Sequence, residues 1–199
     1  MAIVDDGASV LFSHHLQVDE VSNFFLKMDA AREEPDVTHL KLQKLLYFAQ
    51  ANFLASTDQR LFDEDLEAFR HGPVVYKAYQ RFSGSDQIIV ARDSSFQDVA
   101  SPHVPADSER FLHRVWNQYK DFSAGQLRNL THMQDPWRDN YVEGAYRELI
   151  PDKDLASYFR QKVAAKDRVF HEAVVLVPAG FVEALDEDDI AAQMRSFWA

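Results

Sequence analysis

The sequence predicts a mainly α-helical, α+β fold around a central helix at about residues 38–56, with a small β-hairpin and a C-terminal strand–helix appendage. Three observations predict this class. Apolar residues recur every three or four positions along most of the chain, β-leaning runs are short, and only 6 glycines and 7 prolines interrupt the 199 residues. This length suits one core-forming domain that carries an appendage.

The first predicted helix covers about residues 18–28. Its apolar side chains repeat at helical spacing, namely Val18, Val21, Phe24, Phe25 and Met28. Asp19 and Glu20 in the opening turn complement the helix dipole, and Pro35 lies beyond the end. The segment is therefore expected to be an amphipathic helix with one buried face.

The central helix is expected to pack between two layers, with Thr38 as its N-cap. At about 100° per residue its apolar side chains form two stripes. One stripe contains Leu42, Leu45, Leu46, Ala49 and Phe53, and the other contains Leu40, Tyr47, Ala51 and Leu54. The polar residues should then lie on two edges between the stripes, with Lys41, Lys44 and Asn52 on one and Gln43 and Gln50 on the other.

Turn signals dominate the segment after the central helix. The segment 61–70 is short and acidic and mixes apolar with polar residues. A His71-Gly72-Pro73 turn follows, and Pro73 is expected to begin a short helix over 74–82. Residues 87–99 contain two β-leaning pieces, Ile88-Ile89-Val90 and Ser95-Phe96-Gln97. These two pieces predict the small hairpin.

The second half of the chain alternates helices with breaks. Asp107 is expected to cap a helix that reaches Tyr119, and Ser123 with Gln126 forms a capping box for the next helix. The remaining expected elements are an irregular or briefly helical stretch over 134–150, a helix after Pro151, a strand over 169–177 and a final helix over 186–198. We expect a main domain over 17–165 and a C-terminal strand–helix extension over 166–199 that packs on it.

Composition limits the partners and the compartment. The formal charge of −11 repels phosphate backbones and anionic lipid, which argues against nucleic-acid binding. The absence of cysteine excludes disulfides and thiolate chemistry and fits a reducing cytosol. The acidic start at Met1–Asp6, and an apolar stretch over 173–182 that Pro178 interrupts, predict neither export nor membrane spanning. We therefore expect a cytoplasmic protein.

No motif for cofactor or metal chemistry stands out. No two glycines lie within five residues of each other, which excludes a phosphate-binding loop and a dinucleotide fingerprint. The histidine spacing does not suit a metal site, so no cofactor and no metal are expected. His71, or His132 with Asp135, could act as an acid/base group, but turn and helix-end roles are favoured for all three residues.

Three motifs occur together in one order and carry a family resemblance. They are Thr38-His-Leu-Lys-Leu-Gln-Lys-Leu-Leu-Tyr-Phe-Ala-Gln50, Leu61-Phe-Asp-Glu with Leu66-Glu-Ala-Phe-Arg-His-Gly-Pro-Val-Val75, and Thr131-His132 with Asp135-Pro136-Trp137. The run resembles the SocA-like, or Panacea-domain, antitoxin family, which is also met in phage-associated proteins. The resemblance covers about residues 17–165 in family order and spacing, and the pairing of the Leu-Gln-Lys-Leu-Leu-Tyr helix with the Gly-Pro-Val turn is its most specific part.

The resemblance implies a mainly helical bacterial domain without known catalysis that neutralises a protein toxin by direct binding. It further implies a proteolytic adaptor that delivers a SocB-like toxin to the ClpX/ClpP protease. Two other classes stay open, namely a small enzyme that uses His71, His132 or Asp135, and a DNA-binding autoregulator, against which the charge argues. For partner contact we select polar residues of the motifs that are expected to be exposed, with two aromatic residues: Lys41, Lys44, Arg70 and His71, with Tyr76 and Trp137.

Overall fold

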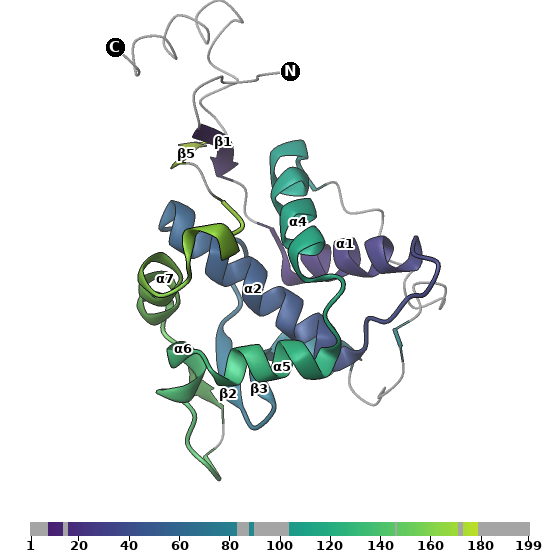
Figure 1. The fold of residues 1–199 in the computed structure, drawn as a ribbon, viewed down its shortest axis with the longest axis vertical. Helices are drawn as coiled ribbons and strands as arrows, with labels where there is room; N and C mark the ends of the chain where they lie inside the picture. Colours follow the sequence, from purple (N-terminus) through teal and green to yellow (C-terminus); the bar gives the residue numbers. More distant parts are fainter. Residues whose placement is uncertain are drawn as a thin grey trace, which may run out of the picture.

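The computed structural model describes residues 8–13, 16–82, 88–89, 104–145, 147–170 and 173–178 (Figure 1). Within these ranges the chain forms seven α-helices, one short 3-10 helix and five strands, which confirms the predicted mainly helical α+β class. The helices are α1 (Val18–Ala30), α2 (His39–Thr57), α3 (Tyr76–Phe82), α4 (Ala106–Tyr119), α5 (Ala124–His132), α6 (Asp135–Arg138), α7 (Asp152–Gln161) and the 3-10 helix Ala165–Asp167. The strands are β1 (Ala8–Ser13), β2 (Leu66–Phe69), β3 (Gly72–Val75), β4 (Glu148–Leu149) and β5 (Ala173–Pro178).

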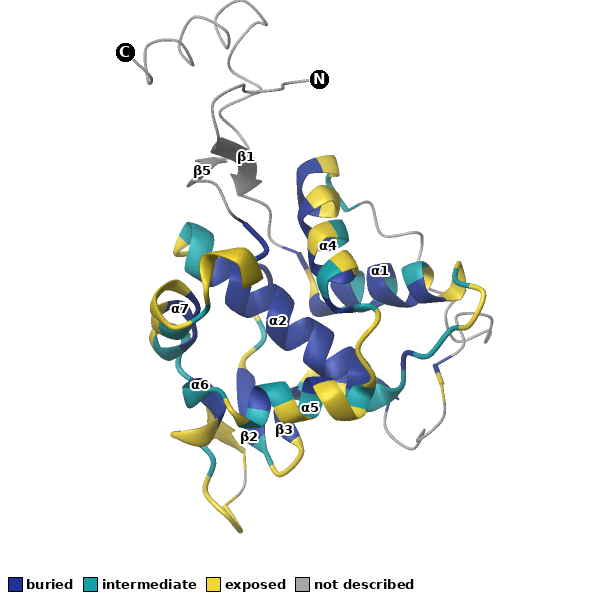
Figure 2. Cartoon of the chain, viewed as in Figure 1, coloured by how far each residue is buried: buried dark blue, intermediate teal, exposed yellow. Residues whose placement is uncertain are grey.

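Helix α2 lies at the centre of the fold, as predicted. The helices α1, α4, α5 and α7 and the strand β3 all pack against it, and Figure 2 shows its length in the buried colour. It begins where expected, because the Thr38 hydroxyl accepts a hydrogen bond from the Lys41 backbone amide at 3.3 Å. The central helix thus contributes apolar side chains to the core on every side.

The two polar edges predicted for α2 are not exposed. Every residue from Lys41 to Leu54 is buried, including both lysines. The polar groups are satisfied inside the protein: for example, the Gln50 amide donates to the Phe62 carbonyl at 3.0 Å and its oxygen accepts from the Leu61 amide at 2.9 Å. Burial of these groups is tolerated because each one has a hydrogen-bonding partner.

The described residues contain a hairpin at β2–β3 that was not predicted from the sequence. The two strands pair antiparallel from Leu66 opposite Val75 to Phe69 opposite Gly72, and β4 pairs with the other edge of β2, in the sheet order β3-β2-β4. The helix predicted over 74–82 begins only at Tyr76, because the buried, β-branched Val74 and Val75 belong to β3. Most of the expected hairpin at 87–99 lies outside the described residues, and Ile88 forms an isolated bridge with Thr38.

The second half of the chain follows the predicted alternation, with one corrected cap. Helix α4 begins at Ala106 after Pro105, so Asp107 is a buried residue of the first turn and not the N-cap. The capping box of Ser123 and Gln126 at α5 is present, and Pro151 precedes α7. The break after α5 contains the four-residue helix α6.

The strand expected over 169–177 begins at Ala173 as β5, which pairs parallel with β1. The final helix expected over 186–198 lies outside the described residues. Among the residues that the structure describes, no helix combines the length and apolar character needed to cross a membrane.

The Leu45→Ala variant tests the position of α2. Leu45 is 0% exposed, so the truncation is expected to lower the free energy of unfolding. A loss of about 2–5 kcal/mol is the usual scale for a core leucine. Denaturant unfolding measures it, with Leu149→Ala as the matched control because Leu149 is 55% exposed. Equal stability of the two variants would contradict the central placement of this face of α2.

Candidate functional site

The turn between β2 and β3 rests on a buried lysine. Lys44 of α2 is 0% exposed, and its Nζ donates a hydrogen bond to the Pro73 carbonyl at 2.7 Å. Burial, with a smaller contribution from Arg128, holds the pKa of Lys44 well below its usual value. The expectation that Lys44 is an exposed contact residue is therefore wrong, because its amine holds the backbone of the turn in place.

Gly72 lies in the part of the turn that packs against the Lys44 side chain. Its φ of +98° is in the left-handed region, and a Cβ there would lie 2.7 Å from both Lys44 Nζ and Thr131 Oγ1. The Thr131 hydroxyl donates to the Arg128 carbonyl at 2.8 Å, which fixes this atom on α5. Glycine is required here for two reasons: the backbone angle, and the close approach of the turn to α2 and α5.

Four basic side chains surround the turn. Arg70 and His71 are exposed at its tip, and Arg128 and His132 approach from α5. Partial burial, with smaller contributions led by Arg128, lowers the pKa of His71 and lowers that of His132 to about 4. Both imidazoles are therefore neutral at pH 7, and the local positive charge comes from the two arginines.

His132 is held by aromatic stacking rather than by Asp135. Its ring stacks on Trp137 with the centroids 3.8 Å apart, and Trp137 stacks on Tyr141 at 4.8 Å. The Trp137 Nε1 donates to the Phe69 carbonyl at 2.8 Å, which ties α6 to the start of the turn. Trp137 is buried, so it supports this surface from below, and its contact with a partner stays a prediction.

Two tyrosines of α3, Tyr76 and Tyr79, lie beside the turn. Tyr76 is half-buried, and the Arg147 guanidinium lies 3.7 Å from its ring centroid. Arg147 is fixed in turn by two hydrogen bonds to the Glu67 carboxylate, at 2.8 and 2.6 Å. Tyr76 also stacks with Tyr79, which is exposed.

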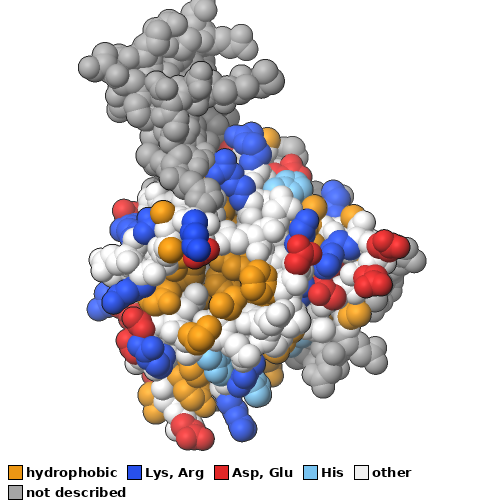
Figure 3. All heavy atoms as spheres, in the orientation of Figure 1, with side chains coloured by type: hydrophobic (Ala, Val, Ile, Leu, Met, Phe, Trp, Pro, Cys, Tyr) orange, Lys and Arg blue, Asp and Glu red, His pale blue; other side chains and the backbone are white. Residues whose placement is uncertain are grey.

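We call this surface the turn face. It is formed by Phe69, Arg70, His71, Tyr76, Tyr79, Arg128, His132 and Arg147. Figure 3 shows blue and pale-blue side chains gathered beside orange ones near the lower edge of the molecule. The surface combines guanidinium groups with aromatic rings, which are the side chains enriched at protein interfaces.

Lys41 does not belong to the turn face. It is fully buried, and its Nζ donates to the Asp36 carboxylate at 2.7 Å and to the Lys120 carbonyl at 2.6 Å. Lys41 therefore joins the segment before α2 to the end of α4. The expectation that Lys41 is exposed is wrong, because its ammonium group is buried and hydrogen-bonded inside the fold.

The enzyme alternative would use His132 with Asp135 as an acid/base pair, and the described residues do not show that pair. Asp135 pairs with Arg138, and no hydrogen bond joins it to His132 within the described residues. The Lys44 amine faces the Pro73 carbonyl in the interior and is not presented to a substrate. In the part of the chain that the structure describes, no three potential ligands are grouped to hold a metal ion.

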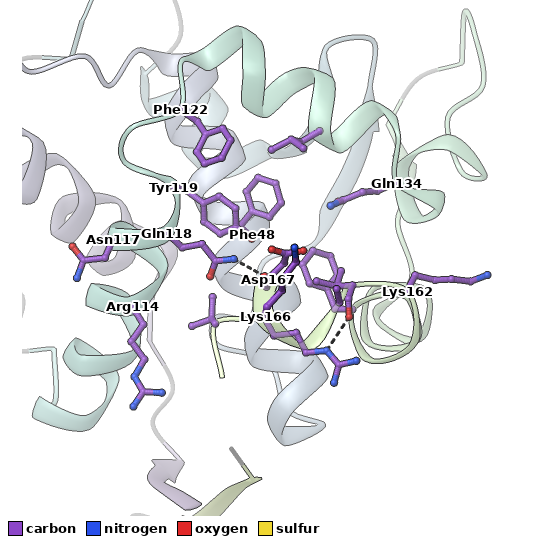
Figure 4. A pocket seen from close by; sticks show the side chains of 16 residues that line it. Phe48, Arg114, Asn117, Gln118, Tyr119, Phe122, Gln134, Lys162, Lys166 and Asp167 are labelled. Carbon is purple, nitrogen blue, oxygen red and sulfur yellow. Dashed lines mark hydrogen bonds between the residues drawn. The ribbon is translucent and has the colours of Figure 1, made fainter. Parts of the chain in front are cut away.

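A groove that sequence reasoning did not find opens between α4, α5 and α7 (Figure 4). It encloses about 1070 Å³, and its apolar wall includes Phe48 and Tyr119, whose rings stack 4.1 Å apart. Burial raises the pKa of Tyr119. The lining residues come from separate segments between positions 48 and 169, so no local motif marks the groove.

The described residues form a small, mainly helical domain in which His132 stacks on Trp137 and Asp135 pairs with Arg138. The family model described as antitoxin SocA-like, Panacea domain, matches residues 42–138, from α2 to α6. The antitoxin SocA of Caulobacter vibrioides is 32% identical over 180 residues, which cover 84% of this chain and 90% of that protein. No solved structure matches. The chain belongs to the SocA-like, Panacea-domain antitoxin family.

Gly72 and Gly144 both have a left-handed backbone conformation, and together they allow a matched test of the turn. Gly144→Ala meets no atom within 4 Å, so it is expected to cost only the backbone strain of about 1–2 kcal/mol. Gly72→Ala adds the clash with Lys44 and Thr131, and overpacking raises the expected loss to about 2–5 kcal/mol. Denaturant unfolding measures both, and equal losses would mean that the close approach at Gly72 carries no energetic weight.

Proposed function

We propose that this antitoxin neutralises its cognate, SocB-like protein toxin by binding it directly through the turn face. In the same proposal the chain acts in the cytoplasm as a proteolytic adaptor that delivers the bound toxin to ClpXP. Membership of the family supports the antitoxin role and implies a toxin partner. The observation that carries the choice of surface is the exposed cluster of arginine and aromatic side chains on a chain of net charge −11.

The turn face is suited to hold an acidic protein surface. Arg70 is exposed and forms no ion pair with any described residue, so its guanidinium is available to a carboxylate of the toxin. Tyr76 is already fixed under Arg147 and beside Tyr79 before a partner arrives. Preordered side chains lose less conformational entropy on binding, which favours affinity.

The DNA-binding autoregulator is the alternative that the same basic groups could serve. A site for duplex DNA typically neutralises several phosphates, often about 6–10 in a tight complex. The turn face offers Arg70 and Arg128 as charged groups, while Arg147 is already paired with Glu67. These few charges, on an acidic chain, favour a protein partner over DNA.

The adaptor role requires two surfaces, because one must hold the toxin while the other contacts the protease. The turn face serves the first purpose in this proposal. The apolar C-terminal group Ser196-Phe-Trp-Ala199 is the proposed contact for the protease, and it lies outside the described residues. A simple structural role for this group remains the competing hypothesis.

Arg70→Glu tests toxin binding through the turn face. The reversed charge is expected to weaken the affinity for the purified cognate toxin by at least about 10-fold, which is 1.4 kcal/mol. Isothermal titration calorimetry measures the affinity, and Lys153→Glu on the exposed start of α7 is the matched control. Unchanged affinity of the Arg70 variant would place the toxin elsewhere. Loss of binding to the promoter DNA of its operon, with toxin binding retained, would favour the autoregulator.

A reconstituted degradation assay tests the adaptor step. Purified ClpXP is expected to degrade the toxin only when this chain is present, because the chain brings the two together. A variant without residues 196–199 should keep the native fold and toxin binding but lose degradation. Degradation that proceeds equally without the chain would contradict the adaptor role. Full degradation with the shortened chain would place the protease contact on another surface.

A further inference from the structure

The groove between α4, α5 and α7 has a floor of buried aromatic rings and an apolar edge that is partly exposed. Phe48, Tyr119 and Phe159 form its base, and Leu130 and Val163 are only partly buried beside them. Phe122 also lines the groove and is 37% exposed. Figure 3 shows the corresponding orange area at the centre of the viewed face. The apolar surface that a partner could reach is therefore that of Phe122, Leu130 and Val163 above the buried rings.

The rim of the groove is basic, in contrast to the chain as a whole. It carries Arg114, Lys162, Lys166 and Arg168, and Asp167 is the one carboxylate among the lining residues. Lys162 and Lys166 are exposed and form no ion pair with any residue that the structure describes. A positive rim on a chain of formal charge −11 attracts a negatively charged occupant.

Helix α5 separates this groove from the turn face. Leu130 on one side of the helix lines the groove, whereas Arg128 and Thr131 contribute to the turn. Residues three or four apart share a helix face, but Arg128 and Leu130 are two apart and point in different directions. The two surfaces can therefore be occupied at the same time.

The size and composition of the groove suit a protein segment. Its 1070 Å³ reaches the upper end of the range of about 300–1,000 Å³ that is usual for small-molecule pockets. An amphipathic helix that enters a groove places apolar side chains at i, i+3, i+4 and i+7 against the wall and leaves polar groups at the edges. Here the edges would have to be acidic to meet the lysines and arginines of the rim.

We propose that the groove between α4, α5 and α7 is a second docking site, which takes an acidic amphipathic helix from a partner protein. The apolar side chains of that helix pack on Phe122, Leu130 and Val163, and its carboxylates pair with Lys162 and Lys166. This site is distinct from the turn face and does not depend on which partner the turn face holds. It gives the chain a means to contact two proteins at once.

The first test uses a defined probe with the full chain. The probe is a fluorescein-labelled peptide of about 14 residues, or four helical turns, with Leu and Phe at i, i+3, i+4 and i+7 and Glu elsewhere. A second peptide carries Lys in place of each Glu. Fluorescence anisotropy is expected to show that the acidic peptide binds at least about 10-fold more tightly, with an affinity that falls as salt rises. Equal binding of the two peptides would overturn the proposal.

Variants of the chain then locate the peptide. Lys162→Glu with Lys166→Glu should weaken binding at least about 10-fold, and Phe122→Ser should weaken it several-fold. Lys27→Glu with Lys153→Glu, two exposed lysines outside the groove, is the charge-matched control, and Arg70→Glu should leave peptide binding unchanged because it acts on the turn face. Unchanged binding by the rim variant would overturn the proposal. Loss with Arg70→Glu but not with the rim variant would assign the peptide to the turn face.

The chain's own acidic segment is the other occupant to be tested. Residues 183–189 contain five carboxylates, at Glu183, Asp186, Glu187, Asp188 and Asp189. In a full-length variant with these residues changed to Gln or Asn, peptide affinity should stay the same if a partner protein is the occupant. A rise of at least about 10-fold would show that the segment competes for the groove and would overturn the assignment to a partner.

Discussion

The burial of α2 on every side is the constraint on which the rest of the structure depends. A fully buried helix with polar side chains has to find a partner for each of them inside the protein. Gln43 accepts from the Val75 amide, Gln50 holds the segment at Leu61, and Asn52 accepts from the Val169 amide. The segments that surround α2 are therefore tied to it by specific hydrogen bonds as well as by apolar packing, so the arrangement of the strands and loops follows from the sequence of one helix.

The turn face is a consequence of the same constraint. Lys44 reaches from α2 to the Pro73 carbonyl, and this contact leaves no room for a side chain at Gly72. The turn is thereby fixed against α5, which places Arg70 and His71 next to Arg128. A buried lysine is costly unless it is hydrogen-bonded, and here the cost is offset by the contact that positions an exposed surface. A support of this kind allows a family motif inside the core to position the side chains of the turn face outside it.

The sequence predicted the parts of the fold that depend on local patterns. The central helix, its Thr38 cap and the capping box at Ser123 follow from helical periodicity and capping chemistry.

The sequence-based prediction was wrong where contacts between distant segments determine the structure. Lys41 and Lys44 were expected to be exposed because a lysine on a helix usually is, and only the positions of Asp36 and Pro73 in the fold make their burial possible. Val74 and Val75 were expected to be helical after Pro73, but the pairing of β3 with β2 overrides that signal. Arg70 and His71 were selected within the Leu66–Val75 motif and Tyr76 directly after it, whereas the groove could not be foreseen because its walls come from distant segments.

The central claim is that the turn face, supported by Lys44 and Gly72, is the surface that holds the toxin. Hydrogen–deuterium exchange of the chain with and without its purified cognate toxin tests it most directly, because backbone amides report protection without any change in the sequence. We expect slower exchange on toxin binding over residues 69–79 and 128–132, with residues 114–122 and 159–169 unchanged. Protection confined to the groove segments, or no change around the β2–β3 turn, would contradict the account.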